Sequence, residues 1–88
     1  MSHLELAVVA NVRELLGTAA GSEHTIEAWE TREGISVVVK RVGSKSWRVD
    51  DRFLVTWRDA LRFFNGADDT VGLALVEEVK RRVEEQRK

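Results

Sequence analysis

The chain has 88 residues, of which 33% are charged and 43% hydrophobic, a mixture typical of one folded domain spanning residues 1–88. It contains no cysteine, which excludes disulfide bonds, thiolate metal sites and catalytic thiols. No apolar run approaches the roughly 20 residues of a membrane-spanning helix, and the first residues lack the pattern of a signal peptide. We therefore expect a cytoplasmic protein without a membrane partner.

The net charge of −1 conceals an uneven distribution of charged residues. Residues 1–39 carry two basic and six acidic groups, residues 40–62 carry seven and three, and residues 63–88 carry five and six. A basic segment in a neutral chain can bind an acidic partner, or it can pair with acidic groups of its own fold. Segment 40–62 is therefore the first surface to test for binding.

A first helix is predicted to begin after Ser2, because Ser2 and Glu5 have the spacing of a capping box. Gly17 is expected to end this helix at about Leu16. The segment Leu6–Val12 has no charged residue, so we expect the helix to be covered on two sides or to lie at an interface between copies. Its main apolar stripe is Leu4, Val8, Val12, Leu15 and Leu16, with Leu6 and Val9 on another side.

The next segment, residues 23–51, is rich in β-branched and aromatic residues and predicts an antiparallel meander. If Arg32-Glu33-Gly34 is a three-residue loop, with Gly34 in the left-handed conformation, Trp29 lies opposite Val37. A two-residue turn would instead separate Trp29 from the other apolar residues, because a one-residue slip turns a strand over. The three-residue loop therefore predicts a core position for Trp29.

A second turn at Gly43-Ser44-Lys45 would pair Val39 with Val49 and Arg41 with Trp47. These two turns together assign the side chains to two sheet faces. The predicted core face comprises Trp29, Ile35, Val37, Val39, Trp47 and Val49, and the predicted outer face Glu30, Ser36, Val38, Lys40, Val42 and Arg48.

Residues 52–55 are predicted as a short fourth strand, although a helix starting at Arg52 also fits the apolar spacing. Thr56 and Asp59 form a second capping motif, and Asn65-Gly66 is expected to end the helix it opens. The expected buried side chains of this helix are Trp57, Ala60, Leu61 and Phe64.

A last helix is predicted from Asp69 to near the end of the chain. Glu77 and Glu78 precede Arg81 and Arg82 by four residues, a spacing that favours ion pairs on a solvated helix face. Its expected stripe is Val71, Leu75, Val76, Val79 and Val83. The predicted fold class is α+β: an N-terminal helix, a three- to four-stranded antiparallel meander, and two C-terminal helices packed on one face of the sheet.

The sequence contains no recognisable catalytic, cofactor-binding or metal-binding motif. His3 and His24 have no acidic or histidine cluster around them, and the glycines are too scattered for a phosphate-binding loop. Adjacent carboxylates such as Asp50-Asp51 diverge and suit turns better than acid–base catalysis. We therefore expect a protein that is not an enzyme and needs no cofactor or metal.

A small protein-interaction module that presents a basic sheet and turn surface to an acidic protein is the favoured function. The alternative is a nucleic-acid-binding domain that contacts phosphates through the same segment, against which the isoelectric point near 6.1 argues. Self-association through the first helix is a further expectation. The predicted partner-binding residues are Lys40, Lys45, Trp47, Arg48, Arg52, Arg58 and Arg62.

Overall fold

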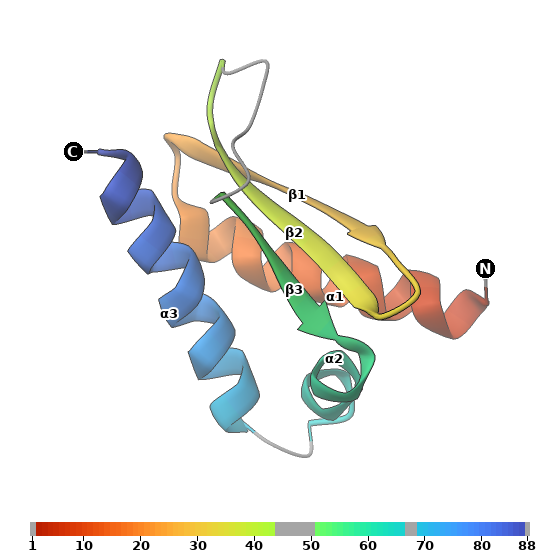
Figure 1. The fold of residues 1–88 in the computed structure, drawn as a ribbon. Coiled ribbons are helices and arrows are strands. Elements are labelled where there is room, and N and C mark those ends of the chain that lie inside the picture. The colour runs from red at the N-terminus through yellow and green to blue at the C-terminus, as the bar shows by residue number, and fades with distance from the viewer. Residues whose placement is uncertain (1, 44–50, 67–68, 88) are drawn as a thin grey trace.

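A computed structural model of the chain describes residues 2–43, 51–66 and 69–87, which form a helical layer on one face of an antiparallel sheet (Figure 1). The strands β1 (His24–Glu30), β2 (Gly34–Arg41) and β3 (Arg52–Thr56) lie in the order β1-β2-β3. The helices are α1 (His3–Ala20), α2 (Trp57–Phe64) and α3 (Asp69–Gln86). The predicted α+β architecture is confirmed.

Helix α1 begins where the sequence predicts and ends four residues later than expected. The hydroxyl of Ser2 accepts a hydrogen bond from the amide of Glu5 at 3.1 Å. Gly17 does not end the helix, since a glycine in a helix costs only about 1 kcal/mol and the buried side of the helix continues to Ala20. Gly21, with a φ of 81°, supplies the left-handed residue that stops it.

The apolar first helix is covered on two sides, by β1 and by the pair of helices α2 and α3. Val8 and Val12 are fully buried, and Val9, on the second apolar side, is 6% exposed. The expected burial of α1 between layers is thus confirmed for its middle. Leu4 and Leu6, near its N-terminus, remain about half exposed.

The register of the first hairpin differs by one residue from the prediction. Trp29 pairs with Ser36, and Ala28 pairs with Val37. The connection is a two-residue turn, Arg32-Glu33, because the amide of Thr31 bonds the carbonyl of Gly34 at 2.6 Å. Trp29 therefore points away from the core and is 38% exposed, so the prediction of a core tryptophan at this position is wrong.

The two-residue turn is stabilised by a side chain that the sequence reading did not consider. The hydroxyl of Thr31 donates to the carbonyl of Gly34 and accepts from its amide. Gly34 is not among the glycines with positive φ. It is needed for a different reason: a Cβ atom at this position would collide with the carbonyl oxygen of Val55 on β3.

Residues 52–56 form a strand, so the rival prediction of a helix starting at Arg52 is wrong. The strand leads directly into α2, whose first amides are capped by the Thr56 hydroxyl as predicted. The indole of Trp57 donates to the carbonyl of Thr31 at 3.1 Å and so fastens α2 to the hairpin turn.

The core side of α2 differs from the prediction at one position. Ala60 is fully buried, and Trp57 and Leu61 pack against the core. Phe63 also packs there, whereas Phe64 is 37% exposed. Phe64 is therefore not buried as expected, although its spacing of seven residues from Trp57 places both on one helical face.

The predicted pairings of Trp47 and Val49 with β2 lie outside the described residues, as do Lys45 and Arg48. Within the described part of the chain, β2 pairs with residues 52–56 through Val38 opposite Arg52 and Val37 opposite Phe53.

The core lies between the inner sheet face and the helices. Its sheet residues are Ile26, Ala28, Ile35, Val37, Val39, Phe53 and Val55.

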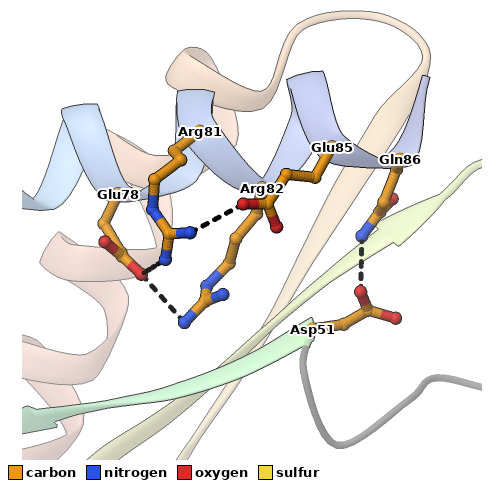
Figure 2. A network of polar contacts seen from close by, with 6 residues as sticks. All are labelled: Asp51, Glu78, Arg81, Arg82, Glu85 and Gln86. Atoms are coloured by element: carbon orange, nitrogen blue, oxygen red, sulfur yellow. Dashed lines mark hydrogen bonds and ion pairs between the residues drawn. The ribbon is translucent and has the colours of Figure 1, made fainter. Parts of the chain in front are cut away.

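Helix α3 is held to the sheet by its C-terminal half (Figure 2). The side-chain amide of Gln86 donates to the carbonyl of Val39 at 2.9 Å and to the carboxylate of Asp51 at 3.0 Å. The guanidinium of Arg82 lies 5.0 Å from the ring centre of Phe53 on β3. Val79 and Val83 complete the contact as predicted, since both are buried.

Candidate interaction surface

The sheet face opposite the helices is the surface that we call the outer sheet face. Successive side chains of a strand alternate between faces, and the core contacts of Ile35 and Val37 identify the inner one. In Figure 1 the three helices all lie on the inner side. The observed register therefore places these residues on the outer sheet face: Thr25, Glu27, Trp29, Ser36, Val38, Lys40, Arg52, Leu54 and Thr56.

An apolar row crosses the outer sheet face from one edge strand to the other. Trp29 on β1 lies opposite Ser36 on β2, which lies opposite Leu54 on β3. Trp29 is 38% exposed and Leu54 is 45% exposed, whereas Ser36 is fully buried. The Ser36 hydroxyl has no hydrogen-bond partner among the described residues, and because it is buried the polar member of this row does not contact solvent.

A charged row lies beside the apolar one. Across the three strands it consists of Glu27, Val38, which is buried, and Arg52, which is exposed. The amine of Lys40, on the neighbouring row, lies 3.2 Å from the carboxylate of Glu27. Lys40 lies on the predicted outer face, where its side chain is partly buried beside Glu27 and 15% exposed. Arg52 is exposed and has no ion-pair partner among the described residues.

The predicted partner-binding residues are divided between two parts of the molecule. Lys40 and Arg52 lie on the outer sheet face, whereas Arg58 and Arg62 are exposed on α2, which packs with the other helices. Arg62 is itself engaged in an interaction within the protein. The described members of the basic segment therefore do not form one continuous surface on the sheet.

Trp29 and Leu54 are the surface residues that the sequence reading missed. The predicted three-residue loop Arg32-Glu33-Gly34 placed Trp29 in the core. Leu54 was predicted to lie in a short strand, without being assigned to a sheet face. The signal that could have found them is Thr31, because a threonine before a two-residue turn can bond the backbone across the turn. That turn places Trp29 on the outer sheet face.

Outside the outer sheet face, the described residues include one buried histidine and one groove. His24 is 5% exposed and both its ring nitrogens lack hydrogen-bond partners. Across residues 2–43, 51–66 and 69–87 no group of three metal-ligating side chains comes together. A groove of about 570 Å³ is lined by residues of α1 and α3, including Glu14 and Lys80, and by Phe63 of α2.

The C-terminal helix carries the strongest described charge network, whose side chains are drawn in Figure 2. Arg81 bonds Glu78 at 2.7 Å and Glu85 at 2.8 Å, and Arg82 bonds Glu78 at 2.8 Å. The predicted pair of Glu78 with Arg82 is confirmed, whereas Arg81 pairs with Glu78 and Glu85 instead of Glu77. The hydrogen bond from Arg81 lowers the pKa of Glu78 below its ordinary value, against a smaller opposing effect of burial.

None of the helices in the described part of the chain combines the length and apolarity that crossing a bilayer requires. Comparison of the chain with protein-family models, with curated proteins and with solved structures found no match.

Proposed function

We propose that the protein is a non-enzymatic interaction domain whose outer sheet face binds an acidic region of a partner protein. The observation that carries the proposal is the pair of exposed apolar side chains, Trp29 and Leu54, on a sheet face that no described helix covers. Tryptophan and arginine are the residues most enriched among those that dominate binding energy at protein interfaces. Here Trp29 and Arg52 share one face.

The charge of this face favours an acidic partner. Lys40 neutralises Glu27 through their contact at 3.2 Å, which leaves the exposed Arg52 as the uncompensated charge of its row. A partner that supplies an apolar side chain for the Trp29–Leu54 row and a carboxylate for Arg52 would match both rows. Such electrostatic matching contributes mainly to specificity and to the rate of association.

The test is a nuclear magnetic resonance titration with two probes: a peptide in which glutamate alternates with leucine, and a single-stranded oligonucleotide. The peptide is expected to shift the Trp29 indole signal, which a Trp29→Phe variant identifies, and added salt should weaken the effect. Arg52→Glu should abolish the shift. Arg58→Glu is the matched control, because Arg58 is equally a surface arginine but belongs to α2.

Two results would count against the proposal. If the peptide moves no signal of the outer sheet face, or if Arg58→Glu weakens binding as much as Arg52→Glu does, the acidic partner does not bind there. If only the oligonucleotide shifts the Trp29 signal, with an affinity that falls linearly on a logarithmic salt scale, the nucleic-acid alternative replaces it.

A further inference from the structure

The two edges of the sheet differ in what their backbone groups can bind. In an antiparallel sheet, alternate residues of an edge strand bond inward and the others point their amides and carbonyls outward. On β1 the bond between Val42 and Glu23, together with that between Thr31 and Gly34, shows that odd-numbered residues bond β2. Even-numbered residues of β1, including Ala28, therefore present their backbone groups to the open side.

One outward backbone group of the β1 edge is already bonded by a side chain from α1. The guanidinium of Arg13 donates to the outward carbonyl of Ala28 at 2.7 Å, and Ala28 is 7% exposed. Self-pairing of two β1 strands about their centre would also place Glu27 opposite Glu27 of the second copy. Both effects oppose the addition of a strand at this edge.

The edge at β3 is not paired with any strand within residues 2–43, 51–66 and 69–87. Phe53 and Val55 bond β2, because they lie opposite Val37 and Ile35, which point away from β1. Arg52, Leu54 and Thr56 therefore direct their backbone groups outward, and all three residues are exposed. Among the described residues no strand bonds Arg52, Leu54 or the amide of Thr56 on that side, whereas the carbonyl of Thr56 belongs to the first turn of α2.

We propose that the β3 edge pairs with β3 of a second copy of this chain, antiparallel and centred on Leu54. In this register the amide and carbonyl of Leu54 bond those of Leu54 in the second copy, and the Thr56 amide donates to the carbonyl of the second Arg52. Phe53 lies opposite Val55 on the inner face. No charged side chain faces one of like sign, so the strand is complementary to itself.

Pairing in this register also joins the two outer sheet faces. The apolar row then runs from Trp29 through Leu54 of one copy to Leu54 and Trp29 of the other, and the exposed part of Leu54 is covered. Arg52 lies beside the neutral Thr56 of the second copy. The proposal goes beyond the binding of an acidic partner and does not depend on it.

The absence of native cysteine permits a register-specific cross-linking test. Leu54→Cys should form a disulfide-linked dimer on mild oxidation, because directly opposed residues of a hydrogen-bonded pair have Cα atoms about 5.5 Å apart, within disulfide range. Arg52→Cys is the matched control on the same exposed strand. Its two copies would be displaced by four positions, about 13 Å, and should not cross-link.

Sedimentation of the native chain and of two lysine variants gives an independent measurement. The native protein should be a dimer, Leu54→Lys a folded monomer by circular dichroism, and Leu6→Lys, on the exposed part of α1, a dimer. The proposal is overturned if the native chain is monomeric, if Leu54→Lys still dimerises, if Arg52→Cys cross-links as readily as Leu54→Cys, or if Leu6→Lys alone dissociates the dimer. The last result would assign self-association to the first helix.

Discussion

Replacement of Gly34 by alanine provides a stringent test of how β2 and β3 fit together. The added Cβ would collide with the carbonyl oxygen of Val55, and it would lie 2.8 Å from the Cα of Thr56 and 2.9 Å from the carbonyl carbon of Val55. All of these atoms belong to the backbone, so no side-chain rotation can relieve the contact. The strand β3 must move away from β2, which weakens the bonds between Ile35 and Val55.

The expected cost follows from these contacts. Overpacking in a well-packed core costs about 1–3 kcal/mol, and each weakened ladder hydrogen bond adds about 1 kcal/mol, so we expect a loss of about 3 kcal/mol. For a domain of this size, that corresponds to a fall in melting temperature of about 12–24 °C. Gly17→Ala is the matched control with the opposite sign. No atom lies within 4 Å of its added Cβ, and alanine in a helix is about 0.5–1 kcal/mol more favourable than glycine.

The assay is thermal unfolding of the two variants and the native chain, followed by circular dichroism at one protein concentration. We expect Gly34→Ala to melt well below the native protein and Gly17→Ala slightly above it. A Gly34→Ala protein that melts with the native chain would refute the close approach of β3 to Gly34. Equal losses for both variants would show that the effect belongs to glycine replacement in general.

Three further substitutions test the α3 anchor, the charge network and the outer sheet face. Gln86→Ala should lower the free energy of unfolding by about 1–3 kcal/mol in urea, because the carbonyl of the fully buried Val39 loses its partner; an unchanged value would contradict the anchor. Glu78→Gln should flatten the acid side of the stability–pH profile: the folded-state pKa of Glu78 lies below 4.5, so its contribution is present above that pH and is lost as the pH falls further. A profile as steep as the native one would show that the Arg81 bond does not stabilise the fold. Ser36→Ala should raise stability by about 1 kcal/mol, since the hydroxyl is buried without a partner, and a clear loss would reveal a hydrogen bond to it.

The helix boundaries that depend on local chemistry could be predicted from the sequence. Ser2 and Thr56 cap helices because their hydroxyls reach amides three residues away, a contact that needs no tertiary structure. The end of α1 could not be predicted in this way. Gly17 is a helix-ending residue locally, but the burial of Ala20 against the rest of the fold favours continuing the helix past it.

The outer sheet face was less predictable because its composition depends on the register in which β1 pairs with β2. Whether Trp29 lies inside or outside is decided by one residue of turn length, and the turn is fixed by the Thr31 hydroxyl and by the space available at Gly34. The second of these is a contact with β3, more than 20 positions along the chain, which no local pattern contains. Charge alone identified Arg52 as a surface residue, but not the apolar row beside it.

The bond from Arg13 to the Ala28 carbonyl has a consequence for how far assembly can proceed. A sheet with two free edges can add copies without limit, and such head-to-tail growth produces fibres. In the proposed dimer the remaining edge of each sheet carries a guanidinium that an incoming strand would have to displace, so strand pairing would end at a closed pair with a twofold axis. Arg13 and Glu27 would thus limit polymerisation together, so we expect Arg13→Ala alone to weaken this block without removing it.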